Sequence, residues 1–173
     1  MKEINALFEQ ASLLEEQGNY AAAEPIFMEA LALKEKDLGA NHQELAPVYY
    51  NAGLLFFAQE KYAEAEDYLS RSLKLEEATL GADNQELLNT LEHLAAVQFN
   101  QGSMEKAEKM YKRFLELHAQ HHGEQGAEII NHLHSLADIC YLSGKFSEGG
   151  EYRLRAQQLL SDELLLAWQA KAS

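Results

Sequence analysis

The chain has 173 residues, of which 47% are hydrophobic and 24% charged. This composition excludes a disordered chain and is sufficient for one domain with a buried core. The formal net charge of -14 argues against nucleic acid and anionic membranes as partners and suits a basic or apolar one, although solubility alone would also explain it.

An internal repeat of 42 residues organises the chain from its first helix to its last. Apolar residues within each repeat fall at steps of three and four, which indicates helices, and the spacing allows two helices per repeat. We therefore predict a single domain, 1–173, with repeats at about 4–40, 41–82, 83–124 and 125–160. The positions that share the period are Tyr20, Tyr62, Met104 and Phe146; Leu33, Leu75, Leu117 and Leu159; Gly39, Gly81 and Gly123; and Ala11, Gly53, Ala95 and Ala137.

The breaks between helices follow the same period. Gly39 and Gly81 are predicted to end second helices, because glycine readily adopts the left-handed conformation of a helix C-cap. Asn41 and Asp83 are then predicted to cap the next helices. The third junction, 123–128, lacks a good cap and is predicted to fray. The turn inside each repeat is expected at Gly18-Asn19, Glu60-Lys61, Gly102-Ser103 and Gly144-Lys145.

The last repeat loses part of its apolar face, as terminal repeats do where one side meets water. Ser161 and Asp162 are predicted to cap a final helix, 161–172, which carries Leu164, Leu165 and Trp168. The simpler interpretation is a helix that shields the end of the stack. The alternative is a docking site for a partner or for a second copy of the chain.

One helix pair cannot bury its apolar face alone, so the four pairs are expected to stack into a superhelix. The recurring small residues let the two helices of a pair approach closely. The recurring tyrosines and leucines are interpreted as core rather than as a cofactor site. Cys140 lies in an apolar stretch and is predicted to be a buried, inert thiol, since nothing around it would activate a nucleophile.

Two segments, 17–27 and 30–42, resemble the tetratricopeptide repeats of kinesin light chains, and the resemblance extends over about residues 4–160. It implies an all-α, right-handed superhelical solenoid of four tetratricopeptide-type helix pairs plus a C-terminal capping helix. It also implies that the first helix of each pair lines a concave groove. The positions it places in that groove are Asn5, Phe8, Ser12, Glu15, Glu16, Pro47, Tyr50, Leu54, Phe57, Ala58, Asn89, Glu92, Ala96, Phe99, Asn100, Asn131, His134, Asp138, Tyr141 and Leu142.

This groove set contains no lysine or arginine. That argues against the family's carboxylate clamp and against the basic groove with which kinesin light chains hold acidic cargo. Its aromatic side chains offer large contact areas, and its asparagines can hold a peptide backbone. We expect a protein or peptide partner with apolar anchors and neutral-to-basic flanks, unless some of these aromatics instead fill gaps between repeats.

Histidines are the one hint of other chemistry. His118, His121 and His122 are spaced so that one helix face could carry two or three imidazoles, whereas His132 and His134 point in different directions. A zinc site usually needs three or four ligands with supporting hydrogen bonds, so we predict no metal and no cofactor. No phosphate-binding loop or nucleophile elbow is present, and we predict that the chain is not an enzyme.

The sequence thus predicts a non-catalytic protein-interaction module or adaptor that binds a peptide segment in its groove. The alternative is a self-assembling scaffold whose end helices mediate homo-oligomerisation, and a third interpretation is a metal-dependent regulator or enzyme built on the His118 cluster. The first residues lack the apolar segment of a signal peptide, and no run approaches the roughly 18 apolar residues of a membrane span. A cytoplasmic location is expected.

Overall fold

The computed structural model describes residues 2–123 and 127–172, without the side chains of residues 127, 163, 164 and 166–172. The described residues form helices and short turns without a strand, which confirms the all-α prediction. Their α-helices are α1 (Lys2–Glu16), α2 (Tyr20–Leu38), α3 (Ala46–Ala58), α4 (Tyr62–Leu80), α5 (Leu88–Asn100), α6 (Met104–His122), α7 (Ile130–Leu142) and α8 (Phe146–Ala172).

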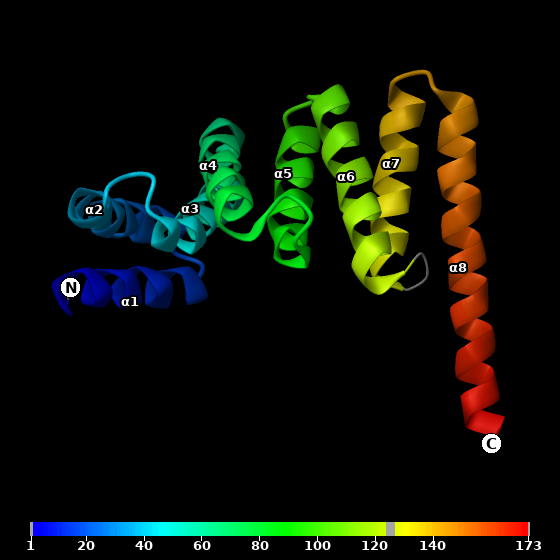
Figure 1. The fold of residues 1–173 in the computed structure, drawn as a ribbon, viewed down its shortest axis with the longest axis horizontal. Helices are drawn as coiled ribbons and strands as arrows, with labels where there is room; N and C mark the ends of the chain where they lie inside the picture. The colour runs from blue at the N-terminus through cyan, green and yellow to red at the C-terminus, as the bar shows by residue number, and fades with distance from the viewer. Residues whose placement is uncertain (1, 124–126, 173) are drawn as a thin grey trace.

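Consecutive helices pair as α1 with α2, α3 with α4, α5 with α6, and α7 with α8, and each pair stacks on the next. The helix direction turns steadily along the stack, from α1 to the nearly perpendicular α8 (Figure 1). Short 3₁₀ turns lead into the first helices α3, α5 and α7: η1 (Gln43–Leu45), η2 (Gln85–Leu87) and η3 (Ala127–Ile129). Within the described residues, no helix is both long enough and apolar enough to cross a membrane.

The predicted caps of α3 and α5 are wrong by one residue. The backbone N–H groups of Glu44 and Glu86 donate to His42 Nδ1 (3.3 Å) and Asn84 Oδ1 (2.8 Å), so His42 and Asn84 replace Asn41 and Asp83 as caps. The reason is a turn closed by a backbone hydrogen bond from residue 42 to Gly39 and from residue 84 to Gly81. This turn encloses Asn41 and Asp83 and keeps them away from the helix ends. The expected fraying at 123–128 concerns residues that are partly outside the described ranges.

The predicted break at Ser161–Asp162 is also absent. Helix α8 runs without interruption from Phe146 to Ala172, so the expected capping helix forms the last turns of α8. The hydroxyl of Ser161 donates to the carbonyl of Gln157 at 2.9 Å. That bond belongs to a helix interior, where serine bonds back to the preceding turn instead of capping a new one. The side chain of Trp168 lies outside the described part.

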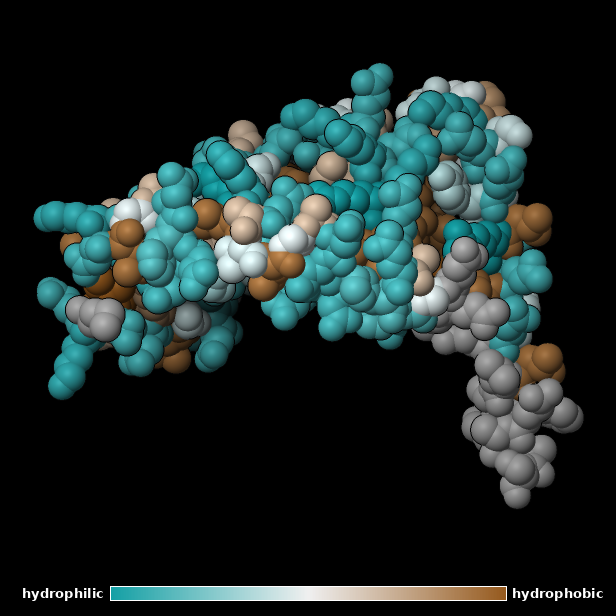
Figure 2. All heavy atoms as spheres, viewed as in Figure 1, coloured by the Kyte–Doolittle hydropathy of each residue, from teal (hydrophilic) through white to brown (hydrophobic). Residues whose placement is uncertain are grey.

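Small residues allow the close helix approach that the repeat predicted. Ala11, Ala95 and Ala137 are completely buried on the first helices. At the equivalent Gly53, a Cβ atom would lie 2.5 Å from Leu69 Cγ, so α3 and α4 touch there almost backbone to side chain. Cys140 is also buried, as predicted, and burial raises the pKa of its thiol. Figure 2 shows hydrophobic residues between the helices, under a mostly hydrophilic surface.

Ion pairs join the second helix of each pair to the next pair. Two of them repeat with the period of the sequence, since Arg71 pairs with Glu35 and Arg113 with Glu77. Lysines add a second row of such pairs, in which Glu108 binds both Lys112 and Lys145 at 2.7 Å. The ladder therefore fixes how successive pairs sit on one another. The lysine row consists of Glu24–Lys61, Glu66–Lys106 and Glu108–Lys145.

Replacing Glu60 by glycine is expected to raise the free energy of unfolding. Glu60 has a positive φ of 60°, whereas glycine occupies the same place in the other three turns. The left-handed backbone costs a side chain about 1–2 kcal/mol, and the freedom of glycine in the unfolded chain offsets part of this, which leaves a gain of about 0.5–1 kcal/mol. Urea unfolding measures it. Gly102→Ala, at the equivalent turn, is the matched control and should destabilise; a Glu60→Gly protein no more stable than the native chain would contradict this account.

Glu108→Gln is expected to lower the free energy of unfolding by about 1–2 kcal/mol at neutral pH, because two ammonium groups lose their carboxylate. Hydrogen bonds from Lys112 and then Lys145 hold the pKa of Glu108 below its ordinary value. A lowered pKa stabilises the fold above the unfolded pKa of about 4.3 and is lost as the pH falls through the folded value. The difference between native and variant protein should therefore shrink in acid. Glu105→Gln, on the exposed side of the same helix, should show no such pH dependence.

Candidate functional site

The predicted groove residues lie on the first helices of the four pairs, and none of the fourteen principal ones is fully buried. Their side chains are half-buried or exposed, so each is available at the surface or at its edge. They are Phe8, Ser12 and Glu15 on α1; Tyr50, Leu54 and Phe57 on α3; Asn89, Glu92, Phe99 and Asn100 on α5; and Asn131, His134, Asp138 and Tyr141 on α7.

Positive charge is segregated from these first helices. Helices α3, α5 and α7 contain no lysine or arginine at all. Of the 14 lysines and arginines, all but Lys2 lie on second helices or on the turns that lead into them. Many of those cations are engaged in the ion pairs between successive second helices. The first helices therefore present a surface of carboxylate, amide and aromatic groups.

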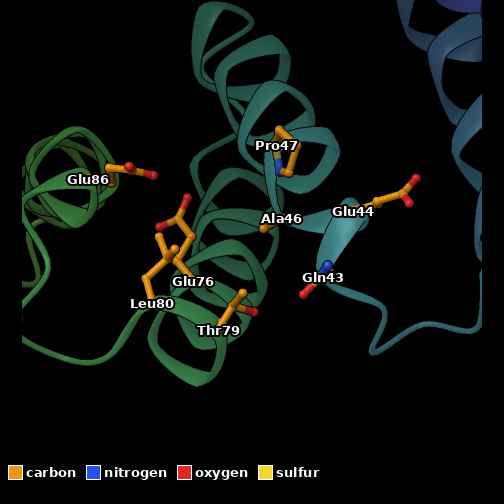
Figure 3. Close-up of a pocket in the computed structure, with 8 residues that line it drawn as sticks. All are labelled: Gln43, Glu44, Ala46, Pro47, Glu76, Thr79, Leu80 and Glu86. Carbon is orange, nitrogen blue, oxygen red and sulfur yellow. The ribbon is translucent and has the colours of Figure 1, made fainter.

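A cleft of about 450 Å³, here called the first cleft, opens where the start of α3 and the end of α4 meet η2 (Figure 3). Glu76 projects from α4 into the gap, and Glu86 faces it from the next pair (Figure 3). No lysine or arginine lines this cleft, which makes it acidic. Its lining residues are Gln43, Glu44, Ala46, Pro47, Glu76, Thr79, Leu80 and Glu86.

Glu76 is the least satisfied carboxylate of the first cleft. Its Oε1 accepts hydrogen bonds from Ser72 Oγ at 3.1 Å and from Thr90 Oγ1 at 3.0 Å, which ties α4 to α5. Its buried Oε2 has no partner among the described residues. Burial is the main cause that raises the pKa of Glu76, and the two hydroxyl bonds only partly oppose it.

The same cleft recurs one repeat later, between the third and fourth pairs, with a volume of about 410 Å³. Five of its lining residues stand 42 positions after residues of the first cleft: Leu88, Asn89, His118, His122 and Glu128. This second cleft also brings three predicted groove residues together, namely Asn89, Glu92 and Asn131. The remaining lining residues are Phe114 and His132.

Two histidine–glutamate pairs face the second cleft. His118 Nε2 lies 3.2 Å from Glu128 Oε2, and His132 Nε2 lies 3.2 Å from Glu92 Oε1. The His132 ring stacks on Phe114, with ring centroids 4.0 Å apart. The sequence analysis missed both pairs, because each joins residues from different helix pairs. The repeat held a usable signal, since Glu128 is equivalent to Glu86 of the first cleft.

The predicted histidine triplet does not form one cluster. The rings of His118 and His122 lie 4.9 Å apart, but His121 Nε2 turns away to within 2.6 Å of the Asp83 carbonyl oxygen. Within the described residues, three metal-binding groups converge within 4.8 Å only at Glu108, Cys140 and Glu148. There the ammonium groups of two lysines already occupy both oxygens of Glu108.

Several predicted groove residues are partly occupied by contacts within the fold. Tyr50 Oη lies 3.2 Å from His93 Nδ1, a residue the sequence analysis did not single out. Arg153 of α8 donates to Asp138 Oδ1 at 2.9 Å and lies over the ring of Tyr141. The negative charge is therefore balanced at the C-terminal end of the first-helix surface, whereas no lysine or arginine lines either cleft.

The tetratricopeptide repeat family model matches residues 3–78 and 86–148 of this chain. No curated protein sequence matches the chain significantly. Among solved structures, BtubC (BKLC) from P. vanneervenii is similar, with a TM-score of 0.80 and 17% sequence identity, over 92% of this chain and 64% of that one. The chain thus spans less than two thirds of the length of BtubC.

Two further structures share the fold. A kinesin light chain-type protein of Podosopora anserina with nearly identical TPR-like repeats has a TM-score of 0.78 and 16% identity, over 92% of this chain and 76% of that one. The crystal structure of MamA has a TM-score of 0.70 and 17% identity, over 93% of this chain and 80% of that one. At such identities the likeness shows a common helical repeat fold.

Glu76→Gln is expected to raise the free energy of unfolding at neutral pH, by up to about 1 kcal/mol, because it removes a charge that burial disfavours. A raised carboxyl pKa penalises folding above the folded pKa, and this penalty disappears as the pH falls below the unfolded value. The gain should therefore vanish in acid. Denaturant unfolding at several pH values measures it, with the exposed Glu44→Gln of the same cleft as control. A loss of stability at neutral pH would show that the charge itself supports the fold.

Proposed function

The chain belongs to the tetratricopeptide repeat family, and from this premise we propose that it is a non-catalytic protein-interaction module or adaptor. Its ligand is a peptide segment that lies along the concave groove formed by the first helices. One observation carries the proposal: α3, α5 and α7 hold no lysine or arginine, while the cations of the chain are gathered on and around the second helices. The family's fold serves protein interaction and scaffolding in general, and this charge distribution supports a specific ligand chemistry.

The partner that suits this surface has apolar anchors and neutral-to-basic flanks. Tyr50, Leu54, Phe57 and Phe99 are half-buried, so each offers part of its apolar surface to a ligand side chain. Aromatic side chains of this kind provide contact area at a low entropy cost. The two clefts add carboxylates one repeat apart, which favours basic side chains at matching intervals of the ligand.

A self-assembling scaffold is the second candidate, and the exposed apolar side chains of α8 favour it. Phe146 is 69% exposed, Leu154 65%, Leu160 47% and Leu165 54%. The ion-pair ladder opposes a simple continuation of the stack, because Gly150 stands where Glu24, Glu66 and Glu108 stand in earlier repeats. Light scattering separates the candidates, since a monomer at about tens of micromolar excludes an assembly that forms with micromolar affinity.

A charge-insertion experiment tests the groove. Peptides are first selected by display on the native chain, and their affinities are then measured for Ala58→Arg and Asn100→Arg, two exposed first-helix positions one repeat apart. Each variant should weaken binding by about tenfold or more, because it places a cation beside a neutral-to-basic ligand. Circular dichroism and unfolding curves check that both variants fold.

The matched controls are Ser70→Arg and Ala78→Arg, which add the same charge at exposed positions of α4. They should leave the affinity nearly unchanged, and high salt should weaken binding to the native chain. Equal losses in all four variants would mean that net charge, not the groove, governs binding. A loss confined to the α4 variants would place the ligand on the second helices and contradict the proposal.

A further inference from the structure

We propose that the second cleft is a receptor for a guanidinium group, so that an arginine side chain of the partner polypeptide inserts between α5, α6 and α7. The inference rests on the proposed function for the source of the arginine. It rests on the cleft alone for the chemistry. Neither the family match nor the similar structures assign a ligand to these residues.

The carboxylates of this cleft lack the cations that other partly buried glutamates have. Each glutamate of the second-helix ladder, from Glu24 to Glu108, pairs with a lysine or an arginine. Glu92 and Glu128 pair only with imidazoles, through His132 and His118. No lysine or arginine lines the cleft. Two carboxylates thus remain without a full countercharge at the walls of one cavity.

His132 makes the need for a donor specific. Its Nδ1 lies 2.8 Å from the carbonyl oxygen of Glu128, which can only accept, so we assign the ring proton to Nδ1. In the neutral ring, Nε2 is then an acceptor, and it faces the carboxylate oxygen of Glu92 at 3.2 Å. Two acceptors at that distance are stabilised by an N–H group that donates between them. Because the His132 side chain is only 9% exposed, water has little access to this nitrogen.

His118 orients the second carboxylate. Its ring is 4% exposed, and its Nε2 is the nitrogen that reaches Glu128 Oε2. Since a carboxylate can only accept, Nε2 carries the proton in this pair. One imidazole N–H uses a single lone pair of Glu128, and the carboxylate offers about four. The remaining lone pairs of Glu128 and those of Glu92 are available to an incoming cation.

The spacing favours a guanidinium over a metal ion. Two ligands of one zinc ion are about 3.3 Å apart, given Zn–N bonds of about 2.0 Å in a tetrahedral site. In the described residues no three metal-binding groups of this cleft converge within 4.8 Å, so its acceptors do not meet at one point. Guanidinium spreads five N–H donors over a plane, pairs with carboxylates in bidentate fashion and stacks on aromatic faces. The rings of Phe114, His122 and His132 line the cavity for such stacking.

The first cleft lacks this arrangement, although it is also acidic. Glu76 and Leu80 stand in place of His118 and His122, and Tyr50 stands in place of Glu92. The carboxylate of Glu76 is held by two hydroxyl groups from within the fold, so its environment is already set. The two clefts therefore provide an internal comparison, in which Glu86 is the equivalent of Glu128.

The test uses N-acetyl-arginine amide as a probe and isotope-labelled full chain, observed by NMR. The probe should shift the signals of Asn89, Glu92, Glu128 and Asn131 and of the His118 and His132 rings, with a dissociation constant in about the millimolar range. Glu92→Gln and Glu128→Gln should each weaken binding by about tenfold, because a charge-assisted hydrogen bond becomes a neutral one. Both side chains are well exposed, so the variants are expected to fold, and Glu86→Gln should bind as the native chain does.

Two neutral or differently shaped probes decide the chemistry. N-acetyl-citrulline amide has the shape of the arginine probe without its charge and should not bind, and N-acetyl-lysine amide should bind much more weakly. Equal binding of citrulline or lysine, binding that the Glu92 and Glu128 variants retain, or shifts confined to the first cleft would each overturn the proposal. Because no selected peptide is needed, failure here is distinct from failure of the groove to bind peptides.

Discussion

The ion pairs between successive second helices are the constraint from which the rest of this structure follows. Arg71 with Glu35 and Arg113 with Glu77 lock each pair against the preceding one at an identical interval. They also gather positive charge on one layer of the molecule. The first helices are left with carboxylates, amides and aromatic rings, so the same interactions that order the stack also define the chemistry of the surface it offers to a partner.

The helix pairs were predictable from the sequence because the same physical demands recur every 42 residues. Glycines at positions 39 and 81 adopt positive φ and end helices, and Ala11 and Gly53 mark the close contact within a pair. The predictions failed at local details. The helix caps moved by one residue because a backbone turn encloses Asn41, and Ser161 continues α8 because its hydroxyl bonds to the preceding turn.

The candidate site was less predictable, because its interactions cross between repeats. The positions of Asn89, Glu92 and Asn131 followed from the family resemblance, but their gathering in one cleft with His118 and His132 depends on how two pairs stack. The partnership of His132 with Glu92 joins residues that no helical spacing relates. Arg153, which covers Asp138 and Tyr141, was equally hidden, because it had been interpreted only as a sign of a degenerate last repeat.

Hydrogen-exchange mapping of the chain with its tightest display-selected peptide tests the central claim most directly, namely that the cation-free first helices form the ligand surface. The account predicts that bound peptide slows exchange in α3, in α5 and at the start of α7, while the exposed faces of α2 and α4 are unaffected. Protection confined to α8, or to the second helices, would contradict it and would move the interaction surface to the end or the outer layer of the stack.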